Sequence, residues 1–205
     1  DWPSIVASGN LPPPMGLRVN SRRISRDEYL VKLTAAGIAA HAVDECGLAL
    51  AKAVPVEALP GFDDGLVSVQ DPGAQMAANL LNPAPGSRVL DACAAPGGKT
   101  AHLLERGDLD LLALDLKPAR CRRIADSLSR LGLTARIEAA DCAKLTTWWD
   151  GRPFDSVLAD VPCTASGVVR RNPDAKWLRR EDDIASFAAA QARIPSALRG
   201  VTTRT

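Results

Sequence analysis

The chain has 205 residues, of which 46% are hydrophobic and 24% are charged, and this ordinary globular composition excludes a disordered, collagen-like or low-complexity protein. Twenty-five Lys and Arg against 24 Asp and Glu leave a net charge of +1, which excludes a highly basic coat and leaves local basic patches open. Because only 4% of the residues are aromatic, we expect a core of Leu, Val, Ile and Ala.

The cysteines are unclustered and odd in number: Cys46, Cys93, Cys121, Cys142 and Cys163. Without a C-x-x-C pair, and with only two histidines, they indicate neither a zinc site nor a disulfide framework, so we expect no metal. Free thiols are typical of a reducing compartment, and we predict a cytoplasmic protein. No apolar run is long enough to span a membrane, so we expect no membrane partner.

Residues 1–69 are expected to form a small α+β subdomain with a linker. A short extended piece is predicted at residues 16–20, followed by a helix at 26–36 that ends on Gly37. Residues 54–69 are punctuated by Pro and Gly, which indicates short strands or a linker.

Residues 70–205 carry the pattern of an α/β domain. A helix is predicted with Asp71 as its N-cap and Pro72 as its first helical residue. Four apolar runs follow, at residues 88–91, 111–115, 135–141 and 154–160, and end in Asp91, Asp115, Asp141 and Asp160. Helical patterns at 99–106 and 117–131 separate the first three runs, which makes the strands parallel. Because ligands bind at the carboxyl ends of such strands, the four carboxylates indicate one ligand with several polar groups.

The segment 89–100, VLDACAAPGGKT, has the pattern of a strand, a loop of small residues and a helix. A phosphate-binding P-loop needs Gly at the position of Cys93, and the G-x-G-x-x-G fingerprint is also missing. The loop therefore favours an adenosine-type ligand without a pyrophosphate, with Asp115 placed for ribose hydroxyls. A purely structural strand-to-helix turn is the alternative.

Residues 160–180 place a thiol and a basic stretch beside the same sheet edge. Cys163 follows Asp160 closely, and the basic residues Arg170, Arg171, Lys176, Arg179 and Arg180 surround Trp177. Cations beside an aromatic ring are typical of single-stranded nucleic-acid sites, whereas a solvated charged loop with an inert cysteine is the alternative. We expect this segment to border the ligand cleft, and Trp177 to pack beneath the loop instead of stacking on a base.

These motifs resemble the bacterial ribosomal RNA small-subunit methyltransferase B family of S-adenosylmethionine-dependent RNA cytosine-5 methyltransferases, from about residue 12 to residue 191. The shared motifs are LRVN at 17–20, ALPGF at 58–62, VQD at 69–71 with Gln75, DACAAPGGKT at 91–100, DVPCTASG at 160–167 and RRNPDAKW at 170–177. The resemblance implies a Rossmann-like class I methyltransferase sheet, S-adenosylmethionine as cofactor, small-subunit ribosomal RNA as partner, and a monomeric full-length enzyme. It also implies that residues 1–69 bind RNA.

Carried over by position, the resemblance implies a role for each motif residue. The cofactor loop falls on Cys93, Ala94, Ala95, Pro96, Gly97, Gly98 and Lys99, the ribose acid on Asp115, an adenine-side acid on Asp141, and the acid between cofactor and cytosine on Asp160. The RNA contacts that the basic stretch itself predicts are Arg170, Arg171 and Lys176. In this chemistry a thiolate adds to C6 of cytosine, which makes C5 nucleophilic toward the methyl group. Cys163 and Asp160 are the implied catalytic residues, with Cys163 assisting breakdown of the adduct.

The attacking cysteine of the family, in a Thr-Cys pair, is not among the five. The chain opens at Asp1 and reaches Thr205 where a fifth strand would begin, and Pro195 is expected to interrupt the preceding helix. We therefore expect a fragment of the enzyme truncated at both ends. The alternatives are a catalytically inactive cofactor- or RNA-binding module, and a nucleotide-dependent enzyme using Gly98 to Thr100, which the missing glycine disfavours.

Overall fold

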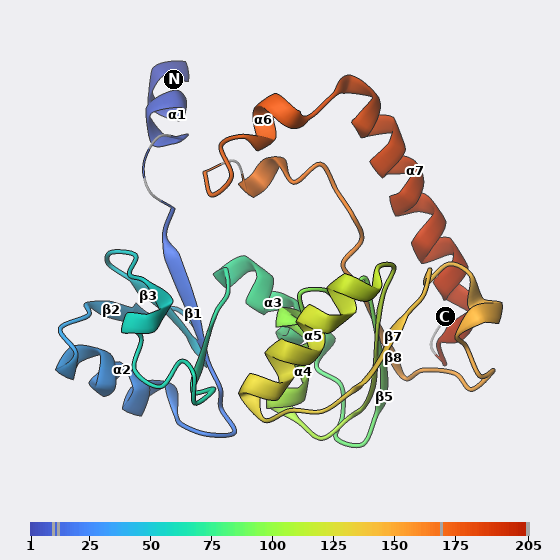
Figure 1. Cartoon of the computed structure of the whole chain (residues 1–205), viewed down its shortest axis with the longest axis horizontal. Helices are drawn as coiled ribbons and strands as arrows, with labels where there is room; N and C mark the ends of the chain where they lie inside the picture. The colour runs from blue at the N-terminus through green and yellow to red at the C-terminus, as the bar shows by residue number, and fades with distance from the viewer. Residues whose placement is uncertain (10, 12, 169, 204–205) are drawn as a thin grey trace.

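The computed structural model describes residues 1–9, 11, 13–168 and 170–203 and contains two four-stranded sheets side by side (Figure 1). The elements before the second sheet are α1 (Trp2–Gly9), β1 (Met15–Val19), α2 (Arg26–Ala35), β2 (Ala40–Ala42), β3 (Gly47–Leu50), the 3-10 turn η1 (Val56–Ala58), β4 (Val67–Val69) and α3 (Pro72–Leu81). The rest are β5 (Arg88–Ala92), α4 (Gly98–Arg106), β6 (Asp110–Asp115), α5 (Pro118–Leu131), β7 (Arg136–Ala139), η2 (Leu145–Thr147), β8 (Ser156–Ala159), η3 (Ser166–Val168), α6 (Ala175–Leu178), α7 (Glu181–Leu198) and η4 (Arg199–Val201).

The first sheet is antiparallel, with the order β2-β3-β1-β4. Helix α2 begins with a capping box between Ser25 and Glu28, which satisfies free N–H groups of its first turn. It buries Tyr29 and Leu33 in an aliphatic cluster with residues of the strands. Of the ambiguous segment 54–69, only the last residues form a strand, β4, which pairs with β1.

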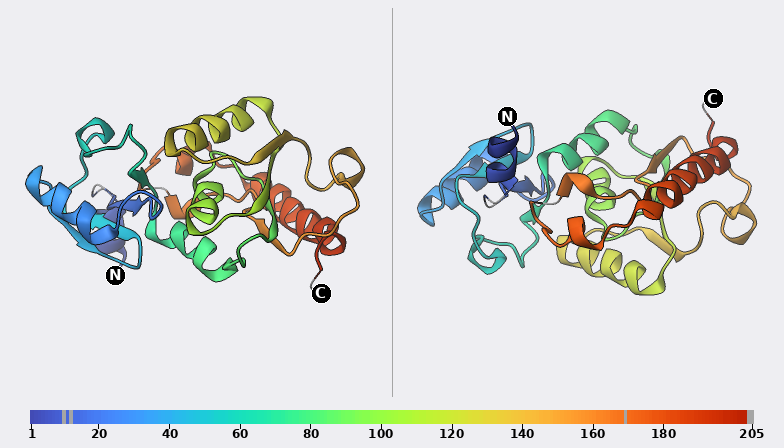
Figure 2. Two further views of the ribbon diagram at one scale, coloured as in Figure 1. Left: turned by 90° about the horizontal axis from the view of Figure 1, so that it is seen from below. Right: turned by 90° about the horizontal axis from the view of Figure 1, so that it is seen from above.

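The second sheet is parallel, with the order β7-β6-β5-β8, as the four apolar runs predict. Asp71 caps α3 through a hydrogen bond from the Gly73 N–H, and Gly132 ends α5 in the left-handed conformation, both as expected. Helices α3, α4 and α5 pack on one face, and α7 packs on the other (Figure 2). The α/β fold with a Rossmann-like parallel sheet is confirmed.

The prediction that Pro195 interrupts a helix is wrong. Helix α7 continues through Pro195 to Leu198, and the Arg199 N–H still donates to the Pro195 carbonyl. Proline removes one backbone donor here, three residues before the helix ends at Leu198. The neighbouring Ile194 and Leu198 are both buried against the sheet, and this packing keeps the last turn in place. Beyond α7, Thr202 forms an isolated parallel bridge with Phe154, just before β8.

No helix in the described part of the chain combines the length and the apolar character that crossing a membrane requires.

Candidate functional site

A cavity of about 340 Å³ lies at the carboxyl ends of β5 and β8, next to the start of α3. Its walls are Val69, Gln70, Asp71, Ala74, Asp91, Cys93, Ala94, Ala95, Pro96, Gly98, Lys99, Asp160, Val168 and Arg171. Every predicted loop residue from 93 to 99 except Gly97 therefore borders one space, together with Asp160. The site forms at the sheet edge where an open parallel sheet binds its ligands.

Asp91 is the buried acid of this cavity, a residue that the sequence pattern grouped with the strand-end acids without giving it a role. Its side chain is fully buried, and the Thr100 hydroxyl donates to Oδ2 at 2.6 Å. Oδ1 has no hydrogen-bond partner within the described chain. Burial raises the pKa of Asp91 to about 7, against the lowering effects of Thr100 and Lys99. Asp91 lines the cavity, and its buried oxygen without a donor suits a ligand that supplies one.

Lys99 and Asp160 close one side of the cavity. Lys99 Nζ, from the first turn of α4, lies 2.5 Å from Asp160 Oδ2, just beyond the end of β8. The turn that aims Lys99 depends on Gly97, whose φ of +99° is in the left-handed region. A Cβ at Gly97 would lie 3.2 Å from the Ile124 Cα, so the glycine also lets α5 approach the loop.

Cys93 borders the cavity but is not an activated thiol. Its Sγ lies 3.9 Å from Cys142 Sγ, and its backbone has a φ of +65°. The contact with Cys142 and burial raise the pKa of Cys93, which keeps it protonated at neutral pH. Cys93 therefore contributes shape to the loop and no nucleophile.

Asp115 and Asp141 lie outside the lining of this cavity, although both follow strands of the same sheet. Asp115 is buried and accepts hydrogen bonds from the Ala95 and Lys117 N–H groups, each at 3.3 Å. It is thus tied to the loop backbone at Ala95. Asp141 forms an ion pair with Arg193 of α7 at 3.2 Å. Burial works in the opposite direction, but hydrogen bonds from Ala143 N–H and Arg193 lower the pKa of Asp141.

Cys163 lies in the exposed loop that leaves Asp160, and it is not part of the cavity wall. Its Sγ accepts a hydrogen bond from the Ala165 N–H at 3.3 Å. The structure therefore brings Asp160 to the cavity and leaves the Cys163 thiol accessible beside it.

The basic stretch is only partly at the cavity. Arg171 lines it and forms an ion pair with Asp71 at 2.7 Å, across the cavity mouth. Arg170 Nε donates to the Leu11 carbonyl at 3.4 Å, and the side chain of Lys176 is outside the described part of the chain. The prediction that Trp177 packs beneath the loop is wrong, since it is 79% exposed. It lies on the single-turn helix α6, which stands apart from the parallel sheet (Figure 1).

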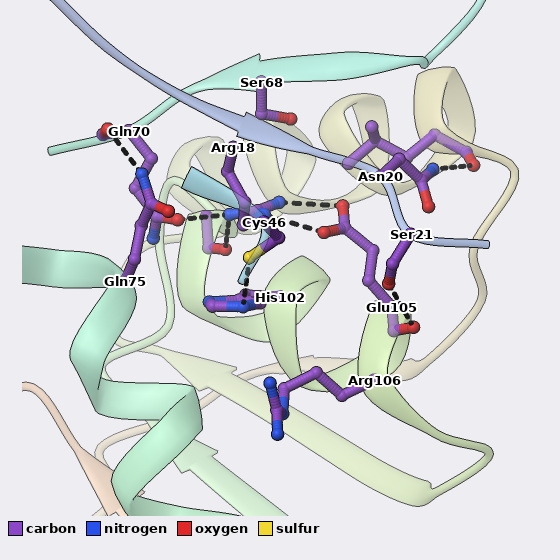
Figure 3. A network of polar contacts seen from close by, with 12 residues as sticks. Arg18, Asn20, Ser21, Cys46, Ser68, Gln70, Gln75, His102, Glu105 and Arg106 are labelled. Carbon is purple, nitrogen blue, oxygen red and sulfur yellow. Dashed lines mark hydrogen bonds and ion pairs between the residues drawn. The ribbon is translucent and has the colours of Figure 1, made fainter. Parts of the chain in front are cut away.

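A buried polar network that the sequence did not predict joins the two sheets behind the loop (Figure 3). Arg18 of β1 is completely buried and forms an ion pair with Glu105 of α4. Beside it, Cys46 Sγ lies 3.5 Å from His102 Nε2. Burial lowers the pKa of His102 to about 3, so its ring is neutral at physiological pH. Arg18 and Glu105 are 87 positions apart, and no local pattern pairs them.

Within the described residues, no group of three or more His, Cys, Asp or Glu side chains could hold a metal ion.

Comparison with known proteins gives matches along nearly the whole chain. Residues 78–204 match the family described as 16S rRNA methyltransferase RsmB/F, and residues 1–57 match a ferredoxin-like domain of RsmF/B-like methyltransferases. Ribosomal RNA small subunit methyltransferase B of Pseudomonas putida is 50% identical over 201 residues, which are 96% of this chain and 46% of the relative. The protein of the same name from Xylella fastidiosa is 52% identical over 187 residues, 89% of this chain and 43% of the relative.

A solved structure described as a methyltransferase homolog protein from Pyrococcus horikoshii has a TM-score of 0.81 and 30% identity, covering 97% of this chain and 64% of that chain. The chain spans a little under half the length of the two curated relatives it matches here.

Proposed function

Because the chain belongs to the 16S rRNA methyltransferase RsmB/F family, we propose that its parallel sheet binds S-adenosylmethionine and serves methylation of C5 of a cytosine in small-subunit ribosomal RNA. The observation that carries the proposal is the cavity in which the loop 93–99, the unpartnered Asp91 oxygen and the Lys99–Asp160 ion pair meet.

The residues at the cavity fit this cofactor. Asp91 Oδ1 offers a buried acceptor, which matches the ammonium group of the methionine part of S-adenosylmethionine. Small loop residues such as Ala94 and Gly98 leave room for close approach of the ligand to the backbone. We assign the ribose hydroxyls to Asp115 and the adenine side to Asp141. When bound, the cofactor supplies a methyl group on a positively charged sulfur.

The chain's own residues prepare the cytosine. We assign Asp160, held by Lys99, to position the base beside the cofactor. In the proposed reaction an enzyme thiolate adds to C6 of the cytosine, and the electron pair of the C5–C6 double bond becomes available at C5. C5 then bonds to the methyl carbon as the bond between that carbon and the cofactor's sulfur breaks, with the electron pair going to the sulfur; a base removes the C5 proton, and the thiol leaves from C6. Cys163, on the accessible loop after Asp160, assists this last elimination.

RNA contacts are assigned to two regions. We place the boundary between an RNA-binding subdomain, residues 1–69, and the catalytic domain at residue 70. Arg170, Arg171 and Lys176 are assigned to phosphates near the target base, because Arg171 lines the cavity and cations on one loop beside a cavity can hold the backbone of a splayed single strand.

A chimera tests the reaction. The matched 201-residue segment of the Pseudomonas putida relative is replaced by the corresponding residues of this chain, and undermodified 16S rRNA is incubated with the chimera and labelled S-adenosylmethionine. Nucleoside analysis by mass spectrometry should find the label in 5-methylcytidine, and the Asp160→Asn chimera should lose it. Label on a ring nitrogen, an exocyclic amine or a ribose oxygen would reject the C5 assignment.

For the 205-residue chain by itself, cofactor binding without turnover is the second candidate function, and the cysteines favour it. Cys46 contacts His102, Cys93 contacts Cys142, and Cys121 donates to the carbonyls of Asp115 and Glu138. Among the five cysteines, Cys163 alone is exposed. A reaction that uses one attacking and one resolving cysteine needs two exposed cysteines.

A further inference from the structure

We propose that Arg18 is a positioning residue that fixes the cofactor loop, residues 93–99, from the antiparallel sheet. The inference rests on the proposed function, which gives this loop its ligand. Arg18 lies on strand β1 behind the loop and does not line the cavity.

Arg18 makes four hydrogen bonds from a completely buried side chain. Its Nε and Nη2 donate to the two carboxylate oxygens of Glu105 at 2.7 and 2.9 Å. Its Nη1 donates to the Gly98 carbonyl at 2.8 Å and to Gln70 Oε1 at 2.5 Å (Figure 3). The flat guanidinium fork can serve all of these acceptors at once, whereas a lysine ammonium is a single point of charge.

Two of the four contacts reach the wall of the cavity. Gly98 and Gln70 both line it, and Arg18 itself does not. Gly98 is the first residue of α4, and the next residue, Lys99, holds Asp160 at 2.5 Å. The backbone position of Gly98 therefore sets the point from which the Lys99 side chain reaches Asp160. A short series of contacts runs from β1 through Gly98 to the carboxylate assigned to the target base.

A contribution to stability does not by itself explain why Arg18 and Glu105 are buried. Moving an arginine and a glutamate out of water costs several kcal/mol per ion, and apolar residues of similar size often stabilise a buried site equally well. The pair with Glu105 would be enough to join the sheet to α4. The remaining donor, Nη1, instead binds the Gly98 carbonyl of the loop and Gln70, as a positioning role requires.

Arg22 provides a matched control. It follows β1, and its Nε donates to the carbonyl of Leu104 at 2.6 Å, at the opposite end of the same helix α4. Its Nη2 pairs with Asp108 at 2.7 Å. Arg22→Met thus removes an arginine that joins the same sheet to the same helix and leaves the loop end untouched.

The experiment measures the loop and the ligand separately in the 205-residue chain. Amide hydrogen exchange of residues 94–99 reports the loop without any ligand, and calorimetry with S-adenosylhomocysteine reports binding. In Arg18→Met we expect exchange in the loop to accelerate at least about tenfold and the Kd to rise about tenfold, the effect of one lost charge-assisted hydrogen bond. Arg22→Met should leave both the loop exchange and the Kd within twofold of the unmodified chain.

Two further variants keep the test decisive. If Arg18→Met fails to fold because Glu105 is left buried without a partner, the double variant Arg18→Met with Glu105→Leu removes both charges and still lacks the Gly98 contact. Glu105→Gln keeps Arg18 on Gly98 and should leave the loop protected. Equal loop exchange in the Arg18 and Arg22 variants would overturn the proposal. Failure of the unmodified chain to bind S-adenosylhomocysteine would count against the proposed function, while loop exchange would still decide the role of Arg18.

Discussion

Lys99 Nζ lies 2.5 Å from Asp160 Oδ2, so an ion pair joins the first turn of α4 to the loop after β8. The side chain of Asp160 remains 58% exposed while that of Lys99 is only 21% exposed, which leaves the carboxylate open toward the cavity. Asp91 lies fully buried on the same cavity and titrates near neutral pH. The positive charge of Lys99 thus acts on both acids, and the charge of the site depends on pH through Asp91.

Cofactor affinity should increase as the pH rises through about 7. The pKa of Asp91 is raised to about 7 by burial, so the acid is neutral below that pH and ionised above it. Only the ionised form forms a charge-assisted bond with the ligand's ammonium group. Calorimetry with S-adenosylhomocysteine between pH 6 and pH 8 should show this increase, and Asp91→Asn should flatten it. A pH-independent affinity in the unmodified chain would show that Asp91 does not meet the ammonium.

The raised pKa of Asp91 has the opposite effect on the stability of the ligand-free chain, which should fall as the pH rises. A folded-state pKa above the ordinary value of 3.8 means that the folded chain binds more protons than the unfolded chain between pH 3.8 and about 7. The contribution of Asp91 to the free energy of unfolding therefore falls as the pH rises through this window. A bound ligand whose ammonium group pairs with the ionised carboxylate should reduce this loss of stability at higher pH.

Acid should destabilise the junction between the two sheets through His102. Burial lowers its pKa from 6.5 to about 3, so between these values the unfolded chain binds the extra proton. The free energy of unfolding should then fall as the pH drops from 6.5 toward 3, with a limiting slope of about 1.4 kcal/mol per pH unit. Urea denaturation at several pH values checks this. His102→Leu should reduce the slope, and the exposed His41→Leu should leave it unchanged.

Replacing Asp115 by Ala should weaken S-adenosylhomocysteine binding by roughly 1.5 to 3 kcal/mol per lost charge-assisted hydrogen bond to the ribose. Asp110→Ala is the control, because Asp110 begins the strand β6 that Asp115 ends and lies at the opposite edge of the sheet. Calorimetry that finds equal affinities in the two variants would remove Asp115 from the ribose site.

The ion pair between Arg171 and Asp71 should compete with RNA for the same guanidinium. Arg170→Ala with Arg171→Ala should reduce the salt dependence of binding to a single strand, lowering the slope by up to about 1.4. Asp71→Asn should act in the other direction and strengthen binding, since asparagine still caps α3 and no longer holds Arg171. Filter binding at several salt concentrations measures both. An unaltered slope in the double variant would place the RNA elsewhere.

Local patterns predicted the elements well because their causes are local. Asp71 and Pro72 start α3 and Gly132 ends α5, as capping chemistry requires, and the apolar runs form four parallel strands. The crossover lengths then decide that the strand-end acids share one edge of the sheet. Asp160 and the loop around Cys93 accordingly meet at one cavity.

The missed features depend on contacts distant in sequence. Arg18 meets Glu105 only where the antiparallel sheet packs on α4, and no sequence pattern near either residue indicates this pairing. Pro195 is tolerated because Ile194 and Leu198 have a sheet to pack against. Trp177 is exposed because its short helix α6 has no apolar face of the sheet beneath it, although aromatic residues are usually buried.

The 205-residue chain alone should not transfer methyl groups. C5 of cytosine becomes nucleophilic only while a thiolate occupies C6, and the proposed scheme uses Cys163 to break that bond, not to form it. The other four cysteines are engaged with partners inside the fold, and Cys93 is held protonated by its contact with Cys142 and by burial. Undermodified 16S rRNA incubated with the chain and radiolabelled S-adenosylmethionine should therefore gain no label, although we expect calorimetry to show cofactor binding. In the active chimera, Cys163→Ala should instead accumulate RNA bound covalently to protein, visible as a slower band on a denaturing gel. Incorporation of label by the chain that disappears in its Cys163→Ala variant would mean that Cys163 attacks C6 itself, and the separate roles of two cysteines would have to be given up.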